Sequence, residues 1–341
     1  MDRTGTTIYE VARQAGVSIA TVSRVQQGLG KVAPATRQRV QRVIDELGYT
    51  PSVLGRGLAG GRREASGVVF PDLSGPYYSE VILGFEDQVA ADGSSVLILA
   101  THGRPGADRM VRELASRFDG LVVMGRTVGD DTVARIVADR VPLVLLARSA
   151  DPSVRAWASS VRADNAGPAV RLAEHLLDRR SHVMFVGDHE SSPDTAERWA
   201  GFVAAHRARG LEPRDAASCG FRESDGYAVA TTLLTSPPRP DGLMCANDEI
   251  ALGAMRAARE HGLRVPDDVA VTGWDDILPA RYVEPALTTV RQPMRELGTR
   301  AAELLRERIE GRRAETRHEL LPTELVIRAS SARQPEREER A

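Results

Sequence analysis

Small hydroxyl side chains and one arginine lie close together near the N-terminus, at Ser18, Thr21, Ser23 and Arg24. Short donors at the start of a helix can bind DNA phosphates, and a guanidinium can bind a guanine through two hydrogen bonds. Two of these residues also have simpler interpretations, because Ser18 could be a plain helix cap and Arg24 could contact only phosphate. The spacing indicates nucleic-acid chemistry if a helix begins at this serine.

Two short helices joined by a tight turn are predicted to position these side chains. Thr7 and Glu10 stand three residues apart, as in a capping box, and Gly16 suits the positive φ of the turn. The first helix has one apolar face, formed by Ile8, Val11, Ala12 and Ala15. The second helix turns Val22 and Val25 inward and leaves its polar residues outside, which is the arrangement that enters a DNA major groove.

A third helix is predicted to begin at Pro34 and to end before Gly48. With the first two helices it forms an all-α helix-turn-helix domain at residues 1–50, followed by a hinge helix or linker at 51–64. The third helix starts after Ala33, so a side-chain cap worth ~1 kcal/mol is expected to be missing.

Charge is distributed unevenly over the 341 residues. Residues 1–63 carry ten basic and four acidic side chains, a net charge of +6, whereas the remainder carries −8. A basic domain on an acidic body predicts a polyanionic partner for the small domain alone. The two cysteines, Cys219 and Cys245, are not spaced as metal ligands, and no signal peptide or membrane span is visible. We therefore expect a cytoplasmic chain with free thiols and no membrane contact.

From Ser66 onward, short apolar runs alternate with helical segments, which predicts parallel sheets covered on both faces. Two series of such runs predict an α/β body of two Rossmann-like lobes at residues 65–330. The boundaries are expected at about 65–162 plus 291–321 for the N-terminal lobe and about 163–290 plus 322–330 for the C-terminal lobe. Ligands bind outside the carboxyl ends of the strands in such sheets, so the cleft between the lobes is the expected site.

An ordered set of motifs resembles the LacI/GalR family of bacterial transcription regulators over almost the whole chain. One of them is Asp-Leu-Ser-Gly-Pro-Tyr-Tyr at 72–78, and the others are at 7–24, 36–37 with 47–51, 119–122, 141–145, 164–165, 198–202, 246–253, 265–276, 285–293 and 321–325. A single helix-turn-helix motif would be weak, but this order across both lobes is highly specific. The resemblance implies a periplasmic-binding-protein-like body, a homodimer, a pseudo-palindromic double-stranded operator and a small-molecule effector that controls DNA binding.

The resemblance implies DNA contacts for Thr7, Tyr9, Ser18, Ile19, Ala20, Thr21, Ser23, Arg24, Lys31, Tyr49, Arg56 and Leu58. Ile19 and Ala20 offer apolar contact, for instance with a thymine methyl group, and no hydrogen bond. Tyr49 is expected to fix the linker against the phosphate backbone, or alternatively to cover the small core. Leu58 stands at the position of a leucine wedged into the minor groove.

Two glycines distinguish the hinge from the family pattern. Gly55 and Gly57 stand where alanine or polar residues are commoner, and each weakens a helix by roughly 1 kcal/mol relative to alanine. We therefore expect a hinge helix that is costly to order and depends strongly on DNA and on dimer pairing.

The resemblance implies effector contacts for Asp72, Tyr77, Tyr78, Asp164, Arg198, Phe221, Asn247, Trp274 and Asp275. An arginine with a carboxylate and an amide suits a hydroxyl-rich or anionic ligand, and the family's usual habit points to a sugar-like molecule. Phe221 and Trp274 could stack on a sugar or a base, or belong to the lobe core. Asp164 could instead cap the helix that begins at Ala166.

Two other function classes fit the chain less well. A small-molecule transport receptor without a DNA function would share the body, but it would not need the N-terminal helix pair. An enzyme on a Rossmann-like body would show Gly-x-Gly-x-x-Gly after its first strand or a P-loop, and neither is present. We therefore expect no catalytic residue, cofactor or metal. The charged segment 331–341 is expected to be a disordered tail without leucine heptads, which predicts a dimer rather than a tetramer.

Overall fold

The computed structural model describes residues 6–26, 32–49, 65–311 and 315–332. Contacts between residues divide the chain into two compact units. The N-terminal unit is Met1–Ala65 with Arg117–Asp119, and the body is Ser66–Ser116 with Gly120–Ala341. Lys31 and the expected hinge at 51–64, with Arg56 and Leu58, lie outside the described residues.

Within residues 6–26 and 32–49, the N-terminal unit has three helices: α1 (Ile8–Ala15), α2 (Ile19–Gln26) and α3 (Pro34–Leu47). Thr7 and Glu10 form the predicted capping box, and Gly16 ends α1 with a φ of 62°, where a Cβ would be strained. Ala33 precedes α3 without a side-chain cap, as predicted. The apolar faces of the three helices meet in one core, formed by Val11, Ala12, Ala15, Val22, Val25, Val40, Val43 and Ile44.

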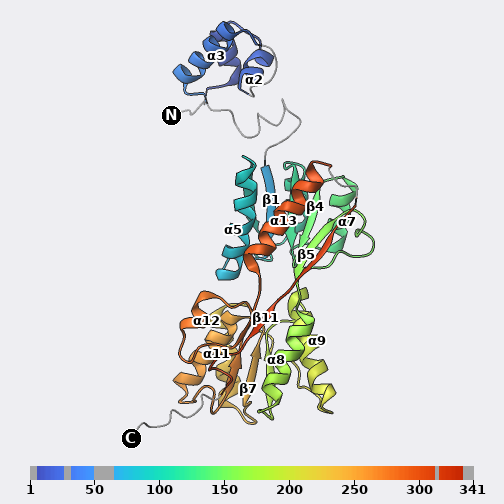
Figure 1. Cartoon of the computed structure of the whole chain (residues 1–341), viewed down its shortest axis with the longest axis vertical. Helices are drawn as coiled ribbons and strands as arrows, with labels where there is room; N and C mark the ends of the chain where they lie inside the picture. The colour runs from blue at the N-terminus through green and yellow to red at the C-terminus, as the bar shows by residue number, and fades with distance from the viewer. Residues whose placement is uncertain (1–5, 27–31, 50–64, 312–314, 333–341) are drawn as a thin grey trace. The chain divides into compact units, whose positions relative to one another are not determined.

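The N-terminal lobe of the body (Figure 1) is built on a six-stranded sheet, whose strand order is β10-β5-β4-β3-β1-β2. Its strands are β1 (Ala65–Phe70), β2 (Ser95–Ala100), β3 (Gly120–Met124), β4 (Leu143–Leu146), β5 (Ser159–Ala163) and β10 (His318–Leu321). The pairs β1–β3, β3–β4, β4–β5 and β5–β10 are parallel. β1, β3 and β4 are buried, which explains their continuous apolar runs. β2 departs from this pattern, because Leu97 and Ile98 on this edge strand are exposed.

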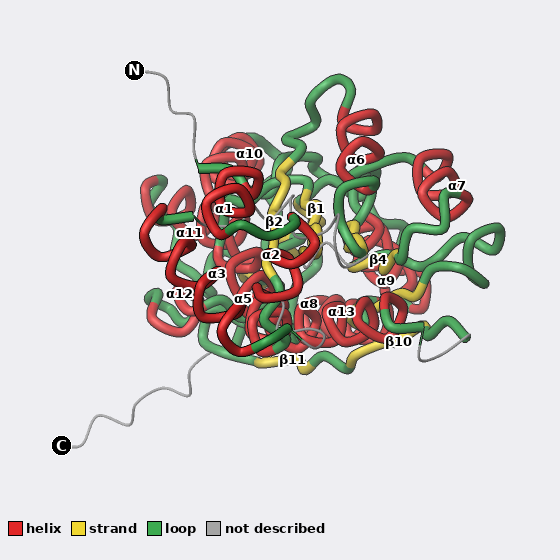
Figure 2. The backbone as a smooth tube through the Cα atoms, turned by 90° about the horizontal axis from the view of Figure 1, so that it is seen from above, coloured by secondary structure: helices red, strands yellow, loops and turns green. Residues whose placement is uncertain are grey.

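Helices cover both faces of this sheet (Figure 2). One face packs against α5 (Pro76–Ala91) and α13 (Met294–Ile309), and the other against α6 (Ala107–Ala115) and α7 (Asp130–Ala138). Gly84 and Gly298 allow α5 and α13 to approach closely, because a Cβ on either glycine would collide with the backbone of the other helix.

The C-terminal lobe contains a parallel sheet with the order β6-β7-β8. Its strands are β6 (Val183–Val186), β7 (Gly242–Cys245) and β8 (Ala270–Thr272). Its helices are α8 (Ala166–Leu177), α9 (Pro193–Ala208), α10 (Glu223–Thr235), α11 (Asp248–Glu260) and α12 (Leu278–Tyr282). Phe185, Phe202 and Trp274 are fully buried in the core of this lobe.

Three crossover segments connect the two lobes. β5 leads into α8, β9 (Thr289–Arg291) leads into α13, and β10 leads into β11 (Glu324–Val326). β9 and β11 form an antiparallel pair that the sequence analysis did not anticipate. The first and third crossovers are also bonded to each other, because Asp164 N–H donates to Leu321 O at 2.8 Å and Thr323 Oγ1 donates to Asp164 O at 2.9 Å.

The ordered body extends beyond the expected start of the tail at 331. Ser331 is buried, and its hydroxyl donates to Thr288 Oγ1 at 2.7 Å and lies 2.8 Å from His175 Nε2. The expectation that the tail starts at this serine is wrong, because its burial depends on distant residues and not on local composition. Residues 333–341 lie outside the described part of the chain.

Candidate functional site

The exposed start of α2 carries the side chains expected to face DNA. Ser18 Oγ accepts the N–H of Thr21 at 3.2 Å and lies 2.9 Å from Thr21 Oγ1. Ser18 is therefore a helix cap whose side chain is still exposed. The other positions of this surface are exposed or half-buried, namely Ile19, Ala20, Thr21, Ser23 and Arg24.

Three further DNA-contact candidates lie elsewhere on the N-terminal unit. The Thr7 side chain caps α1, and the Tyr9 ring is largely exposed. Tyr49 packs half-buried against the helical core, and burial raises the pKa of its hydroxyl. This packing agrees with the alternative interpretation of Tyr49, so its contact with the DNA backbone stays a prediction. A bond from Arg39 Nε to Ala15 O at 2.9 Å, which the sequence analysis missed, ties α3 to α1.

Arg198 on α9 is the centre of a buried polar cluster in the body. Its Nε donates to Asn165 Oδ1 at 2.8 Å, and its Nη1 donates to Ala246 O at 2.7 Å. The guanidinium also lies 4.5 Å from the ring centroid of Trp274, so this ring is covered by a cation rather than open for stacking. These contacts fix the guanidinium in one orientation, which a binding site requires.

Two carboxyl groups, the buried Asp275 and the half-buried Asp194, interact electrostatically with this guanidinium. Burial raises the pKa of Asp275 to about 7, against the opposing effects of Arg198 and of a 2.6 Å hydrogen bond from Gln292 Nε2. Burial also raises the pKa of Asp194 to about 6, although the positive charge of Arg198 stabilises the ionised carboxylate and so lowers this pKa. Asp194 Oδ1 accepts Asn165 Nδ2 at 3.0 Å. Carboxyl groups with pKa values this far from the ordinary range are typical of functional sites.

Three buried polar atoms of this region have no hydrogen-bond partner within the described residues: Tyr77 Oη, Trp274 Nε1 and Gln292 Oε1. Tyr77 belongs to the N-terminal lobe, yet its hydroxyl interacts electrostatically with Asp194 and Asp275, and burial raises its pKa well above the ordinary value. Buried polar atoms without partners are uncommon in native proteins. This region therefore offers a hydroxyl, a donor and an acceptor to a ligand.

Asp72 and Tyr78 are engaged within the protein. Asp72 Oδ2 accepts Arg222 Nη2 of the C-terminal lobe at 3.0 Å and Ser74 Oγ of its own loop at 3.0 Å. Burial favours the neutral acid, but these bonds and two backbone N–H bonds lower the pKa of Asp72 to about 2. Tyr78 packs edge-on against Phe70, with ring centroids 5.8 Å apart.

The remaining candidates have structural contacts of their own. Asn247 caps α11 by accepting Ile250 N–H at 2.9 Å, and its Nδ2 donates to Phe221 O at 2.9 Å. The Phe221 side chain packs against the core of the C-terminal lobe. The alternative of a helix cap at Asp164 is wrong, because Asn165 occupies the N-cap position of α8 and no side chain caps that helix.

The sequence analysis missed Asn165, Asp194 and Gln292 as members of this cluster. Asp194 could have been found, because it stands four residues before Arg198 and therefore on the same helix face. Gln292 could not, because it reaches Asp275 only where β9 lies beside the end of β8, with Asp275 bridged to Arg291.

Neither a metal centre nor a membrane span emerges from the described residues. Within them, no group of three or more His, Cys, Asp or Glu side chains could hold a metal ion, and Cys219 and Cys245 are free thiols. In the same part of the chain, no helix is both long and apolar enough to cross a membrane.

Two protein-family models match the chain. Residues 7–52 match the bacterial regulatory proteins of the lacI family, and residues 173–331 match the periplasmic binding protein-like domain. The chain is 31% identical over 338 residues to the HTH-type transcriptional repressor CytR of Escherichia coli (strain K12), which covers 97% of this chain and 98% of CytR. The chain belongs to the LacI family. The predicted fold, a helix-turn-helix domain with a periplasmic-binding-protein-like α/β body, is confirmed.

Solved structures of LacI-family regulators match over the whole length. The lac repressor dimer bound to operator and the anti-inducer ONPF has a TM-score of 0.80 and 28% identity, covering 96% of this chain and 99% of the repressor chain. The transcriptional regulator CelR in complex with cellobiose has a TM-score of 0.71 and 30% identity, covering 95% and 99%. This LacI-family chain is thus a transcriptional regulator with a DNA-binding and an effector-binding domain, and its relatives are regulators rather than enzymes.

Proposed function

We propose that this LacI-family chain is a homodimeric repressor that binds a pseudo-palindromic operator and is controlled by a hydroxyl-rich, sugar-like effector in its body. The observation that carries the effector part is the set of unpartnered buried atoms near Arg198: Tyr77 Oη, Trp274 Nε1 and Gln292 Oε1. A polyol can donate to and accept from such atoms, and a guanidinium or a carboxylate can bind two neighbouring hydroxyls. The cellobiose complex of the relative CelR supports the same ligand class.

A thermal-shift panel on the full chain tests the effector. The panel contains D-ribose, cellobiose, other sugars and nucleosides, and a ligand present at ~100 times its Kd should stabilise the chain by roughly 2.7 kcal/mol. Tyr77→Phe removes only a hydroxyl that has no partner among the described residues. This variant should melt no lower than the wild type without ligand, and should lose roughly 1 kcal/mol of the binding free energy. A flat response to every sugar and nucleoside contradicts the proposed ligand class.

Selection of duplexes from a random pool by the full chain tests the operator. A symmetric dimer presents two copies of α2, so the recovered sites should be two-fold symmetric. Arg24→Ala then separates the two interpretations of this exposed arginine. If Arg24 binds a guanine, the variant loses about 1–3 kcal/mol of discrimination at one base pair. If it binds phosphate, all sequences weaken alike and the salt slope falls by about 1. Recovery of asymmetric sites alone speaks against a symmetric dimer.

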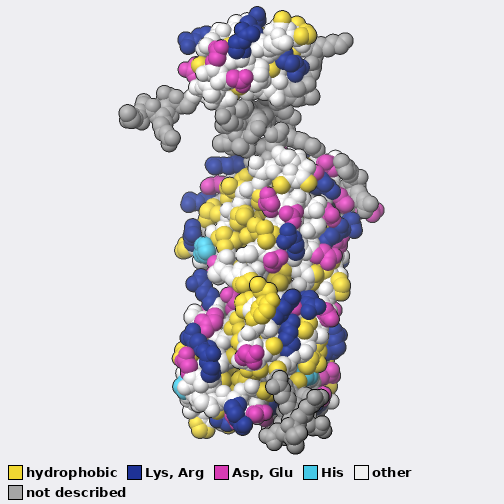
Figure 3. All heavy atoms as spheres, turned by 60° about the vertical axis from the view of Figure 1, so that its left-hand side comes forward, with side chains coloured by type: hydrophobic (Ala, Val, Ile, Leu, Met, Phe, Trp, Pro, Cys, Tyr) yellow, Lys and Arg dark blue, Asp and Glu magenta, His cyan; other side chains and the backbone are white. Residues whose placement is uncertain are grey.

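Exposed apolar side chains on the body support the dimer. Among the described residues they include Leu83, Leu97 and Ile98 in the N-terminal lobe and Leu278 and Tyr282 in the C-terminal lobe. Figure 3 shows hydrophobic side chains gathered in patches on one face of the body. Contiguous exposed apolar patches mark protein–protein contact surfaces. Sedimentation velocity at micromolar concentration should therefore give the mass of two chains, and a mass of one or four chains contradicts the dimer.

A further inference from the structure

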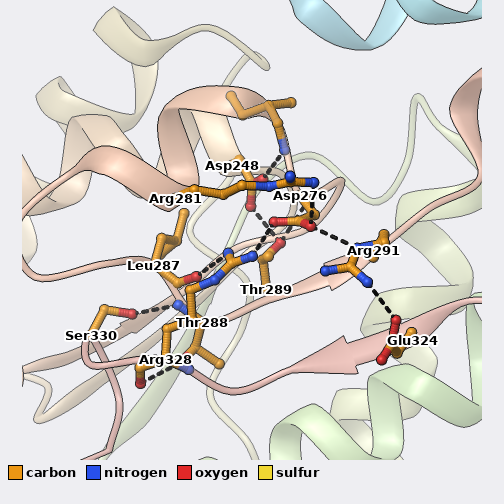
Figure 4. Close-up of polar contacts among 11 residues, drawn as sticks. Asp248, Asp276, Arg281, Leu287, Thr288, Thr289, Arg291, Glu324, Arg328 and Ser330 are labelled. Carbon is orange, nitrogen blue, oxygen red and sulfur yellow. Dashed lines mark hydrogen bonds and ion pairs between the residues drawn. The ribbon is translucent and has the colours of Figure 1, made fainter.

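A second polar cluster of the body is centred on Asp276 (Figure 4). The carboxylate is fully buried and accepts hydrogen bonds from three arginines. Oδ2 accepts Arg291 Nε at 2.8 Å and Arg281 Nη2 at 3.2 Å, and Oδ1 accepts Arg328 Nη2 at 2.5 Å. Burial on its own would raise the pKa of Asp276, but the arginines lower it, so this group is a buried anion that needs its cations.

The three arginines come from different parts of the fold. Arg281 lies on α12 within the C-terminal lobe, whereas Arg291 ends β9, where the chain crosses towards α13. Arg328 follows β11 and also donates to Leu287 O at 2.8 Å. Arg291 in addition donates from Nη1 to Glu324 Oε2 on β11 at 2.7 Å. Asp276 is therefore the point at which two crossover segments are attached to the C-terminal lobe.

Asp276 directly follows Asp275, whose carboxylate belongs to the candidate effector site. Both residues have a positive φ, 114° at Asp275 and 57° at Asp276; aspartate tolerates the second value, but 114° is uncommon for a non-glycine residue and persists when its surroundings fix it. The residues that surround this dipeptide belong to β9 and to Gln292, which follows it. Asp275 N–H donates to Val290 O at 2.8 Å, Asp276 N–H donates to Thr289 Oγ1 at 3.4 Å, and Gln292 donates to the Asp275 carboxylate. Four consecutive crossover residues thus bond to this dipeptide.

Asp248 holds the same turn from the side of α11. Its buried carboxyl group accepts Ile277 N–H at 2.9 Å and the Thr289 hydroxyl at 2.6 Å. Gly273 leaves room for this approach, because a Cβ there would collide with the Asp248 side chain. The turn at 274–277 is therefore hydrogen-bonded to α11 of the C-terminal lobe on one side and to the crossover strand β9 on the other.

We propose that Asp276 is a positioning residue that makes the turn at 274–277 and the crossover strands β9 and β11 move as one unit. The inference rests on the proposed effector site. A ligand that shifts Asp275 must then shift Arg291, and through it Glu324, because one buried carboxylate binds the strand that continues into the N-terminal lobe. Coupling between distant sites needs a connected element of this kind, whose arrangement both sites bias.

Hydrogen–deuterium exchange of the ligand-free full chain, with two matched variants, tests whether Asp276 makes the turn, β9 and β11 move as one unit. Arg291→Gln breaks the Asp276 contact on the crossover side together with the Arg291–Glu324 pair, whereas Arg281→Gln breaks an Asp276 contact within the C-terminal lobe. Asp276→Asn leaves the Arg291–Glu324 pair in place and so isolates the part played by Asp276. We expect Arg291→Gln to speed exchange about tenfold in the turn, in β9 and in β11 together, equivalent to roughly 1.4 kcal/mol of opening free energy. Arg281→Gln should leave exchange in both crossover strands unchanged. Asp276→Asn should speed exchange in the same segments as Arg291→Gln. If Asp276→Asn does not fold, the comparison of Arg291→Gln with Arg281→Gln tests the proposal.

Two results would overturn the proposal. One is equal acceleration of β9 and β11 by Arg281→Gln and Arg291→Gln, which would make Asp276 an anchor of the lobe without special attachment to the crossovers. The other is acceleration of the crossover strands by Arg291→Gln with an unchanged turn. Because no ligand is present in this experiment, a failed effector panel contradicts the proposed function and leaves the result on Asp276 intact.

Discussion

At the scale of single residues, several carboxyl groups of the body have pKa values far from the ordinary value of an aspartate. Asp194 and Asp275 have raised pKa values because burial disfavours their charged forms, whereas Asp72 has a lowered pKa because Arg222 and its own loop bind the carboxylate. Folding therefore shifts the pKa of aspartate in opposite directions in this body, upward at Asp194 and Asp275 and downward at Asp72. The sequence identified Asp72 and Asp275 as candidates, but their protonation depends on burial and partners that only the folded chain provides.

The first prediction concerns Asp275 and pH. The pKa of Asp275 rises from an ordinary 3.8 to about 7 on folding, chiefly through burial. The folded state then binds more protons than the unfolded state between about pH 4 and pH 7, so this group makes stability fall as pH rises through that window. Asp275→Asn should flatten the fall and be at least as stable as the wild type at pH 8. Thermal unfolding from pH 4 to pH 8 measures both effects.

Asp268→Asn is the control for this pH series. The hydrogen bonds and charge of Arg264 lower the pKa of Asp268. The stabilisation from Asp268 is therefore present above its ordinary pKa and is lost only as pH falls through the lowered value. The slope between pH 5 and pH 7 should be the same in this variant as in the wild type. If Asp268→Asn and Asp275→Asn flatten the pH dependence of stability equally, the fall in stability cannot be assigned to Asp275.

At the scale of secondary-structure elements, two pairs of helices in the body pack closely because glycines lie where they cross. α5 meets α13 at Gly84 and Gly298, and α10 meets α11 at Gly226 and Gly253, where added Cβ atoms would strike backbone of the facing helix. The alternation of apolar runs with helical segments predicted helices between the strands of the body. It did not show which helix faces which glycine, because that depends on the order of the strands the helices connect.

The second prediction concerns this crossing. Gly298→Ala places a Cβ against Val81 O and the N–H of Phe85, and such overpacking should cost about 1–3 kcal/mol of the free energy of unfolding. Gly129→Ala is the matched control, because it has an ordinary φ of −68° and open space around the added Cβ. Because Gly129 is the N-cap of α7, where alanine is less favourable than glycine, the cost of this variant should be that of a weaker cap, about 0.5–1 kcal/mol, with no steric part. Urea unfolding measures both variants, and similar midpoints would refute the steric argument.

At the scale of the whole body, polar contacts join the two lobes directly. A ligand can shift an equilibrium only through its different affinity for two arrangements of the protein. Asp72 and Arg222 form an ion pair from one lobe to the other, and Arg126 Nη1 of the N-terminal lobe donates to Glu190 O of the C-terminal lobe at 3.1 Å. These contacts exist only while the lobes keep this arrangement, so they favour it over an opened one.

The third prediction concerns the ion pair between the lobes. Arg222→Gln removes a pair that is partly exposed to solvent, so the loss is limited to about 1 kcal/mol or less. Binding of the ligand found in the panel should weaken by less than about fivefold, and the difference from wild type should shrink at high salt. Isothermal titration at two salt concentrations measures this. Arg222→Lys keeps the positive charge opposite Asp72 and should recover part of the affinity, and an equal loss in Arg222→Lys and Arg222→Gln contradicts ion pairing.

The sequence by itself determined the parts of this protein that depend on near neighbours along the chain. The capping box at Thr7 and Glu10, the turn at Gly16 and the buried parallel strands follow from local spacing, and so does the helix pair that presents Arg24. The tertiary structure decided which distant residues meet. Gln292 reaches Asp275, and Arg291 reaches Asp276, only because β9 returns beside the end of β8. No periodicity encodes such a contact, since it arises from the order of the strands and the path of the crossovers between them.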